Sequence, residues 1–240
     1  MKRLSVTTLL GVSLSTEKKD YILLEIIKGL KYRKDKFYIV TPNPELIMIA
    51  LKDKEYRSVL NQAQWSLSDG IGVLMAARFL GLGIKSRLTG VDFMQELVSK
   101  CAEQGLTTGF FGAAPGVAVK TSSCLKKIYP NLKVVYENDK WDIRELKGKH
   151  IDMLFVALGS PKQEKWIAKN LSNLPVTSAM GVGGAFDFLS GSVPRAPKIM
   201  RSIGLEWLFR LIIQPWRFKR QKALPMFVFK VLQERFSPSK

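Results

Sequence analysis

Short apolar runs alternate with amphipathic helical patterns along most of the chain, and this alternation constrains the fold more than any other feature. Two segments carry a helical period, one from Ile22 to Leu30 and one from Phe93 to Cys101. The apolar runs have the length and composition of buried strands: FYIVT (37–41), TTGFFG (107–112), LKVVYE (132–137), DMLFVALG (152–159) and VTSAMGVGG (176–184). Strands and helices in turn predict an α/β fold, a Rossmann-like parallel sheet with helices on both faces.

The N-terminal residues MKRLSVTTLLGVSLS combine a basic start with an apolar stretch, as a weak signal peptide does. The stretch contains hydroxyl residues and no A-x-A cleavage site, so we interpret it as the first strand. No run elsewhere approaches the roughly 20 uninterrupted apolar residues of a membrane-spanning helix. Arg210 and Arg217 interrupt the best candidate, so we expect a protein that does not span a bilayer.

Positive charge is concentrated near the C-terminus. The chain has 38 Lys and Arg against 20 Asp and Glu, a formal charge of +18, which predicts attraction to nucleic acid, an anionic membrane or phosphorylated substrates. Residues 196–240, called the tail below, hold ten Lys and Arg against only Glu206 and Glu234. The motif PRAP (194–197) precedes this change to a basic helical pattern. We therefore expect an α/β core over residues 1–195 and a helical basic appendage over residues 196–240.

Cysteine and histidine are too few for a disulfide framework or a zinc site. Cys101 and Cys124 do not form a C-x-x-C motif, and His150 is the only histidine. We expect both cysteines to be reduced, as in a cytosolic protein.

Polar residues and glycines follow the predicted strands, where parallel α/β folds bind their ligands. They are Thr41, Asn43, Asp69, Gly70, Gly112, Gly159 and Gly183. Taken singly, some have simpler explanations, because Asn43 before Pro44 is a good helix start and SDG is a common turn. The stretch GVGGAF is typical of a phosphate-binding loop, but its spacing is not the G-x-G-x-x-G of a dinucleotide fold.

Taken together, the motifs along the chain resemble those of the WecG/TagA/CpsF glycosyltransferases, glycosyltransferase family 26. In chain order they are VTPNPELIMIA, SDGIGVLMAARFLG, RLTGVDFM, FFGAAPGVA, VALGSPKQEKWI, GVGGAFDFLSGSVPRAPKIM and GLEWLFRLIIQPWRFKR. The resemblance extends from about Val6 to Arg220. One departure is YENDKWD (136–142), where family members often carry GYF, and it leaves the contacts made there open.

The resemblance implies transfer of a sugar from a UDP donor to lipid-diphosphate-linked N-acetylglucosamine at the cytoplasmic face of the bacterial cell membrane. Such products supply wall teichoic acid linkage units or surface polysaccharides. N-acetylmannosamine is the sugar we expect, while its uronic acid or glucose stays open because no residue decides between such donors.

Glycosyl transfer needs a base that takes the proton from the acceptor hydroxyl. Asp69 is our candidate, because it stands at a strand end beside Gly70 and matches the catalytic aspartate of the family. Asp92 and Asp187 compete with it. A favourable position at a helix N-terminus explains Asp92, and Asp187 either holds a donor hydroxyl or uracil or caps a loop. The α-linked donor and β-linked product of the family imply inversion in one displacement, for which a single base is enough.

The departing diphosphate needs positive charge or hydrogen-bond donors. The chain has no D-x-D pair, which holds a divalent cation in many nucleotide-sugar transferases. We therefore expect metal-independent transfer without a cofactor, testable by activity in EDTA. Arg87 of RLTG and Arg210, Arg217 and Arg220 of the tail are the cations expected to meet the phosphates.

Three further polar side chains are expected at the substrates. Thr41, in the catalytic group with Asp69 and Arg87, and Asn43 would orient a sugar, and Gln163 of PKQE would reach the donor. For Gln163 the alternative is a solvated first helical turn. The glycines Gly112, Gly159 and Gly183 would let the substrates approach the backbone.

The tail interleaves aromatic and basic residues, notably from Trp216 to Lys222. Such mixtures suit a membrane interface, where each Lys or Arg near an anionic surface contributes about 1 kcal/mol. We expect the tail to dock the protein on the membrane and to complete the active site. The alternative is a core helix with a solvated basic face or a contact between copies, so a homo-oligomer stays open.

Two other classes of function compete. A basic nucleic-acid-binding protein would explain the mixture of charge and aromatics, but it would leave the polar strand ends without a task, so we expect no nucleic-acid partner. A dinucleotide-dependent oxidoreductase would explain GVGGAF, but the spacing disfavours it.

Overall fold

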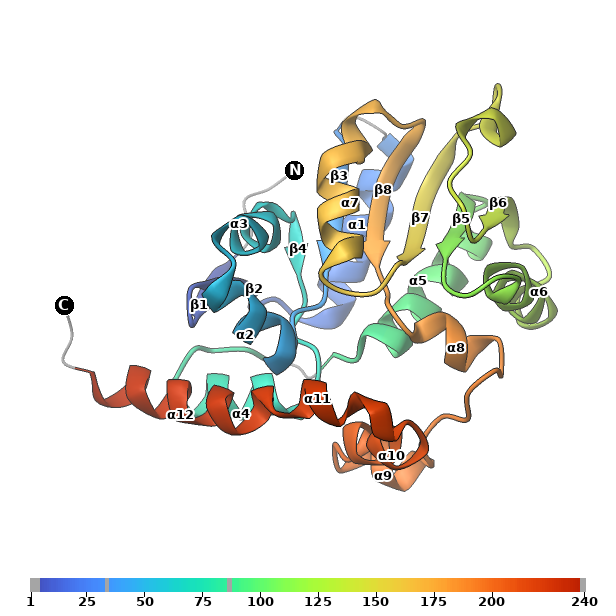
Figure 1. Ribbon diagram of the computed structural model, residues 1–240. Helices are drawn as coiled ribbons and strands as arrows, with labels where there is room; N and C mark the ends of the chain where they lie inside the picture. Colours follow the sequence, from blue (N-terminus) through green and yellow to red (C-terminus); the bar gives the residue numbers. More distant parts are fainter. Residues whose placement is uncertain (1–4, 33–34, 86–87, 238–240) are drawn as a thin grey trace.

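The computed structural model describes residues 5–32, 35–85 and 88–237. Its centre is a six-stranded sheet in the order β4-β3-β8-β7-β5-β6, and every pairing in it is parallel (Figure 1). The strands are β3 (Phe37–Val40), β4 (Trp65–Ser66), β5 (Thr107–Gly112), β6 (Lys133–Asn138), β7 (Ile151–Ala157) and β8 (Val176–Gly181). The predicted α/β fold with a parallel sheet is confirmed.

Helices cover both faces of this sheet, because its central strands are apolar on both sides. All seven residues of β7 are buried. Phe155 faces a cluster that contains apolar residues of α1, α5 and α6, whereas Leu154 and Val156 face a cluster that contains Ile167 of α7. Successive residues of a strand point to opposite faces, which explains why β7 is a continuous apolar run.

The helices of the core are α1 (Lys19–Tyr32), α2 (Pro44–Lys52), α3 (Lys54–Gln62), α4 (Ile71–Phe79), α5 (Gly90–Glu103), α6 (Val117–Ile128), α7 (Lys162–Asn170) and α8 (Ala185–Leu189). Those of the tail are α9 (Lys198–Ser202), α10 (Glu206–Ile213), α11 (Phe218–Gln221) and α12 (Ala223–Phe236). Short 3-10 helices are η1 (Ile143–Leu146), η2 (Leu171–Asn173) and η3 (Pro215–Arg217).

The N-terminal segment differs from the single strand predicted for it. It forms an antiparallel hairpin of β1 (Val6–Leu9) and β2 (Val12–Ser15), in a sheet of its own. The turn residues Leu10 and Gly11 both have positive φ, 50° and 79°, as the commonest two-residue hairpin turns require. The apolar pattern of these residues is that of a strand, but the turn that divides it in two was missed.

The tail packs against the core through its last helix. Phe227 and Val231 of α12 are buried in a cluster with apolar residues of the hairpin and of α2, α3 and α4. Figure 1 shows α12 running along α2 and α4. The Leu10 N–H donates to Glu234 Oε2 at 3.3 Å, which adds a polar contact between the two chain ends. The division into a core and an appendage at residue 195 stays a prediction. Within the described residues, no helix combines the length and the apolarity that crossing a bilayer requires.

Candidate active site

The carboxyl ends of the parallel strands meet at the edge of the sheet that faces α8 and the tail, where the arrowheads of β7 and β8 point in Figure 1. The chain leaves β5 for β6 on one side and leaves β7 for β8 on the other. Ligands of open α/β sheets bind in the crevice at such a switch point. The strand ends that the sequence predicts at the ligand site therefore lie at the carboxyl edge of the sheet, where such a crevice forms.

Two of the predicted glycines flank this crevice and differ in their surroundings. Gly112 has φ 97°, and a Cβ there would lie 3.0 Å from the carbonyl carbon of Ala157, so this glycine permits close packing of β5 against β7. Gly159 has φ 76°, and a Cβ there would meet no atom of the described residues within 4 Å. Of the two, Gly159 is therefore the one that leaves room for a ligand beside its backbone.

Asp69 follows β4 and is held by two segments of the chain. Its N–H donates to Pro42 O at 2.9 Å, and its carboxylate Oδ1 accepts the Gly90 N–H at 3.1 Å. A Cβ at Gly90 would lie 3.4 Å from the Thr41 hydroxyl oxygen, so Thr41 reaches the same place. The structure thus brings Thr41 and Asp69 together at the start of α5. Their roles in the reaction stay predictions.

Asn43 takes the structural role that the sequence offered as its alternative. Its Oδ1 accepts the Leu46 N–H at 3.0 Å and caps α2. Pro44 occupies the first turn of that helix. A contact of Asn43 with a sugar stays a prediction.

Gln163 is buried, at 3% exposure, and is not the solvated first-turn residue of the alternative. Its Oε1 accepts the Gly183 N–H at 2.9 Å, and its Nε2 donates to Glu164 Oε1 at 2.8 Å and to the Ser160 hydroxyl at 3.2 Å. Gln163 therefore fixes the glycine turn after β8. Its direct contact with a donor stays a prediction.

Glu164 is a buried carboxyl that was not among the predicted site residues, although it belongs to the motif PKQE. It is 1% exposed, and its Oε1 also accepts the Ser160 hydroxyl at 2.7 Å. Burial raises the pKa of Glu164, and the hydrogen bonds from Ser160 and Gln163 oppose that rise only in part. A local motif does not show whether a side chain is buried, so the burial of Glu164 could not be predicted from the sequence.

The tail brings Arg210 onto the glycine turn. Arg210 Nη2 lies 3.8 Å from Asp187 Oδ2, and the guanidinium lies 4.7 Å from the centre of the Phe188 ring. A Cβ on Gly184 would overlap the same guanidinium. Burial lowers the pKa of Arg210, against the opposing effect of the Asp187 charge. Asp187 thus faces Arg210 and helps to hold this tail cation in place.

A second tail arginine reaches the first turn of α2. Arg220 Nε lies 3.0 Å from Glu45 Oε1, and the charge of Arg220 contributes to the lowered pKa of Arg210. These two arginines therefore gather near the carboxyl edge of the sheet. Arg87 and the side chain of Arg217 lie outside the described residues, and the roles expected of them stay predictions.

Asp92 anchors the tail to the core. Its Oδ1 lies 2.7 Å from Arg195 Nη1, and Arg195 Nε lies 3.0 Å from Glu206 Oε1 on α10. Burial acts to raise the pKa of Asp92, but hydrogen bonds from Arg195 and Thr89 outweigh it and hold the pKa below its ordinary value. The cap of α5 is Thr89, so Asp92 is more than the favourable first-turn carboxylate that the sequence suggested. Arg195 was missed because PRAP was interpreted only as a boundary.

The departure from the family pattern at residues 136–142 forms a local aromatic cluster. The Tyr136 hydroxyl donates to Lys140 O at 2.6 Å and accepts the Asp142 N–H at 2.9 Å. Trp141 packs on Phe111 and on Trp166, with ring centres 5.3 Å apart in both pairs. The segment is thus tied to β5 and α7 through its aromatic rings.

Within the described residues, no three His, Cys, Asp or Glu side chains gather in a way that could hold a metal ion. The site consists of one carboxylate at a strand end, Asp69, a glycine turn after β8, and arginines from the tail. Such a set offers a base on one side and positive charge for phosphates on the other.

Comparison with known proteins gives the family of the chain. Residues 7–240 match the glycosyl transferase WecG/TagA/CpsF family. A Bacillus subtilis (strain 168) protein named N-acetylglucosaminyldiphosphoundecaprenol N-acetyl-beta-D-mannosaminyltransferase is 39% identical over 202 residues, which are 82% of this chain and 79% of that protein. A protein of the same name from Staphylococcus aureus (strain NCTC 8325) is 29% identical over 224 residues, 89% of this chain and 88% of that protein. The chain therefore belongs to the WecG/TagA/CpsF family of glycosyl transferases.

Proposed function

We propose that this protein transfers N-acetylmannosamine from a UDP donor to undecaprenyl-diphosphate-linked N-acetylglucosamine, the step that builds the linkage unit of wall teichoic acid. The names of the relatives state the sugar and the acceptor, and the matches span most of both chains. The observation that carries the proposal is the position of Asp69, whose carboxylate lies at the carboxyl edge of the sheet within 3.1 Å of the Gly90 nitrogen.

Asp69 serves as the general base in this proposal. The Gly90 N–H orients the carboxylate by its hydrogen bond to Oδ1, and Oδ2 takes the proton of the acceptor hydroxyl. Thr41 lies close enough to orient that hydroxyl. Attack on the anomeric carbon then breaks the bond to the diphosphate in one displacement, which converts an α-linked donor into a β-linked product.

Arg210 and Arg220 serve the leaving diphosphate. Arg210 lies over the glycine turn that Gln163 holds in place, and a partly buried guanidinium binds phosphate more strongly than an exposed one. The donor diphosphate would lie across this turn, close to the backbone of Gly183. Arg87 and Arg217 are further candidates on sequence grounds alone.

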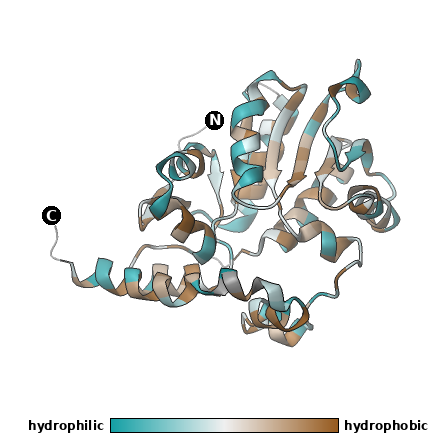
Figure 2. Cartoon of the chain, in the orientation of Figure 1, coloured by the Kyte–Doolittle hydropathy of each residue, from teal (hydrophilic) through white to brown (hydrophobic). Residues whose placement is uncertain are grey.

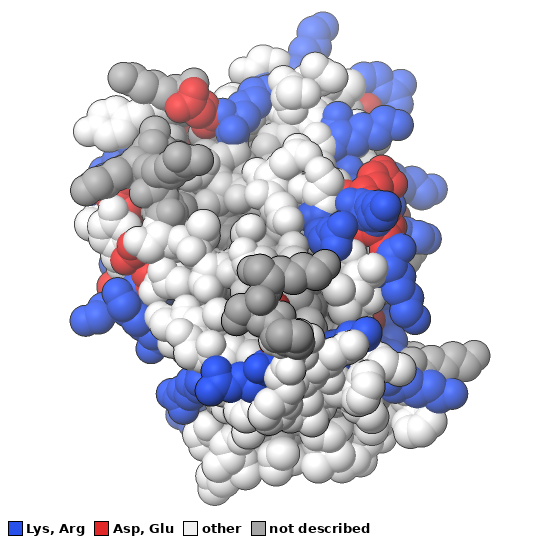
Figure 3. Space-filling model, turned by 90° about the vertical axis from the view of Figure 1, so that its left-hand side faces the viewer, with Lys and Arg blue, Asp and Glu red and all other residues white. Residues whose placement is uncertain are grey.

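The outer face of the tail supports docking on a membrane. Large apolar side chains are exposed on α9 to α12 and on the neighbouring α4: Ile199, Ile203, Trp216, Phe218, Phe229 and Phe236 are 59–76% exposed, and Met75 is 62% exposed. Apolar residues recur along these helices in Figure 2, and Figure 3 shows Lys and Arg bordering a broad uncharged surface at the same end of the molecule. An apolar face with a basic border fits an anionic bilayer at the inner side of the cell membrane.

Transfer is tested by UDP release with a panel of UDP sugars and a short-chain lipid-diphosphate N-acetylglucosamine acceptor, in buffer with EDTA. We expect acceptor-dependent release from UDP-N-acetylmannosamine. Release from another UDP sugar alone would reassign the donor, and release that stops in EDTA would show a need for metal. No acceptor-dependent release from any donor would contradict the proposal.

Docking is tested separately by sedimentation with vesicles. We expect the protein to bind vesicles that contain an anionic lipid, and we expect Trp216→Ser with Phe218→Ser to reduce the bound fraction several-fold. The exposed Tyr32→Ser, on α1, is a control outside the tail. Equal binding of all three proteins would contradict the docking face.

A further inference from the structure

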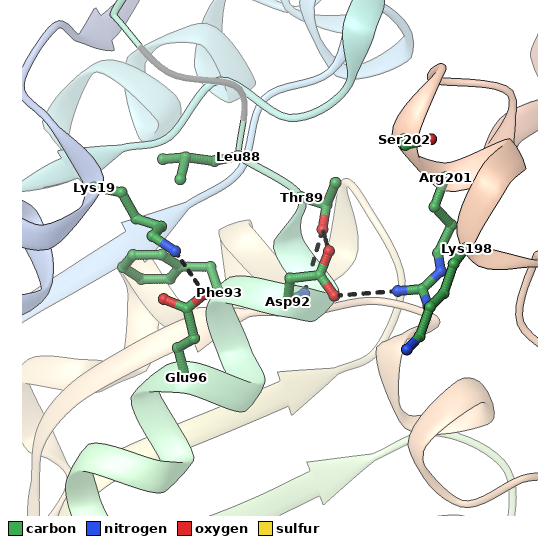
Figure 4. Close-up of a pocket in the computed structure, with 9 residues that line it drawn as sticks. All are labelled: Lys19, Leu88, Thr89, Asp92, Phe93, Glu96, Lys198, Arg201 and Ser202. Carbon is green, nitrogen blue, oxygen red and sulfur yellow. Dashed lines mark hydrogen bonds and ion pairs between the residues drawn. The ribbon is translucent and has the colours of Figure 1, made fainter.

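A cavity of about 500 Å³ lies where the tail first meets the core, between α5 and α9 (Figure 4). The core side of its wall consists of Lys19, Leu88, Thr89, Asp92, Phe93 and Glu96, and the tail side consists of Lys198, Arg201 and Ser202. None of the functions assigned above uses this cavity. Its volume is sufficient for a small polar ligand group.

The carboxylates of the wall are neutralised by partners, whereas the tail side adds further positive charge. Asp92 pairs with Arg195 at 2.7 Å, and Glu96 pairs with Lys19 at 2.7 Å. Arg201 reaches toward Asp92 in Figure 4, with Nη1 at 3.8 Å from Oδ1. Lys198 is exposed and forms no ion pair with any described residue. An anion entering the cavity would therefore meet Lys198, whose charge no described acid pairs.

One part of the cavity wall adjoins the proposed base. Leu88 of the wall pairs with Asp69 in a parallel bridge. The residue after Thr89 is Gly90, whose N–H donates to the Asp69 carboxylate. A sugar placed at Asp69 could thus be joined directly to a group that occupies the cavity.

Helix α9 belongs both to the wall of the cavity and to the apolar face of the tail. Helix α9 turns Lys198 and Arg201 to the cavity, while its Ile199 and the adjoining Ile203 are 76% and 59% exposed. One short helix therefore separates a cationic wall from an apolar surface. Asp69 thus adjoins the cavity through Leu88, and the cavity adjoins the apolar face of the tail through α9.

We propose that the α5–α9 cavity binds the diphosphate of the lipid-linked acceptor, with Lys198 and Arg201 contacting its phosphates. The acceptor has its parts in the corresponding order: a sugar, a diphosphate and a hydrocarbon chain. This inference rests on the proposed function for the identity of the acceptor. It assigns the acceptor diphosphate to α9 and leaves the donor diphosphate to Arg210 and Arg220 at the glycine turn, so the two diphosphates have separate sets of cations.

The test compares Lys198→Gln with the matched control Lys149→Gln. Lys149 is exposed and precedes β7, so it lies at the opposite, amino edge of the sheet. Equilibrium binding of a water-soluble N-acetylglucosaminyl diphosphate with a short isoprenyl chain is measured without donor or membrane, and UDP binding is measured by calorimetry. Initial rates then give the KM for the same acceptor.

We expect Lys198→Gln to weaken acceptor binding and raise the acceptor KM about tenfold, the loss of one charge-assisted contact, with kcat and UDP affinity unchanged. Arg201→Lys keeps the charge and should have a smaller effect. Because Lys198 makes no ion pair with the described residues, the variant should fold as the wild type does, and its melting curve checks this.

Several outcomes would overturn the inference. If Lys198→Gln and Lys149→Gln bind the acceptor equally well, Lys198 does not contact the acceptor phosphates. Weaker UDP binding in Lys198→Gln would place the donor diphosphate in the cavity. Unchanged binding of the soluble acceptor, together with weaker sedimentation of Lys198→Gln with acceptor-free anionic vesicles, would make Lys198 a contact for lipid headgroups. Because acceptor binding is measured without transfer, a failure of the proposed reaction with UDP-N-acetylmannosamine is distinguishable from a failure of this inference.

Discussion

The guanidinium of Arg210, on the tail, lies so close over Gly184 that a Cβ on this glycine would overlap it. Gly184 has φ −79°, which any residue adopts, so its backbone does not require glycine. What the position requires is the absence of a side chain. The contact between Gly184 and Arg210 therefore defines how the tail sits on the turn after β8.

Gly184→Ala should displace Arg210 without unfolding the protein, because the overlapping atoms are the far end of a flexible side chain. If Arg210 stabilises the leaving diphosphate, kcat/KM for the donor should fall roughly tenfold to a hundredfold, as for the loss of a charge-assisted contact. The measurement is a double-mutant cycle with Arg210→Ala. We expect the double variant to be little worse than either single variant, and fully additive effects would show that the two residues act separately.

Asp69→Asn should abolish proton removal and keep the hydrogen bond from Gly90, because asparagine Oδ1 can still accept it. General base catalysis contributes roughly 10²–10⁴-fold, so kcat should fall by that factor while UDP affinity stays the same. Asp20→Asn, an exposed carboxylate in the first turn of α1, is the control. If Asp69→Asn keeps more than roughly a tenth of the wild-type turnover, Asp69 is not the general base.

The sequence predicts the parts of this site that depend on local pattern. Thr41 and Gly159 each end an apolar run, and Asp69 follows the short stretch QWSLS. The end of a parallel strand lies at the ligand-binding edge of the sheet. Contacts between distant segments have no such local sign. The pairing of Arg195 with Asp92 joins the end of the core to α5. The burial of Glu164 depends on how α7 packs, so neither feature could be derived from spacing.

The prediction of a single N-terminal strand failed for a similar reason. Leu10 adopts positive φ, a conformation in which an aliphatic residue is rare, and the turn signal at that position is therefore weak. Leu10 is buried in one apolar cluster with residues of α12, and this burial offsets the unfavourable backbone conformation. Tertiary packing in this case overrides local preference.

Glu164→Gln should change the pH dependence of stability. Burial raises the pKa of Glu164 above its ordinary value of 4.5. Stability from this group is complete below pH 4.5 and is lost as the pH rises through the raised pKa, because the unfolded chain releases its proton first. A glutamine stays neutral, so the melting temperature of the variant relative to the wild type should increase as the pH rises above 4.5 and through the raised pKa.

The control for this titration is Glu103→Gln. A hydrogen bond from Lys100 lowers the pKa of Glu103, so its contribution is present above pH 4.5 and is lost as the pH falls. Its substitution should therefore give a small trend of the opposite sign. A difference between Glu164→Gln and the wild type that does not vary with pH would mean that the carboxyl titrates normally.

Arg195→Gln should loosen the tail. Arg195 joins Asp92 of α5 to Glu206 of α10, and its side chain is only 18% exposed. Loss of the guanidinium leaves two partly buried carboxylates without their shared cation, at a cost of about 1–3 kcal/mol in the free energy of unfolding. Because Glu206 lies one helical turn before Arg210, the same change should also shift Arg210 from the glycine turn.

Limited proteolysis measures this loosening. We expect cleavage near Pro194 to be several-fold faster in Arg195→Gln than in the wild type, and donor kcat/KM to fall with it. Arg144→Gln is the matched control, because the exposed Arg144 pairs with Asp142 at the start of η1, and it should leave both unchanged. Equal cleavage in the two variants would show that the tail is held by the burial of Phe227 and Val231 alone.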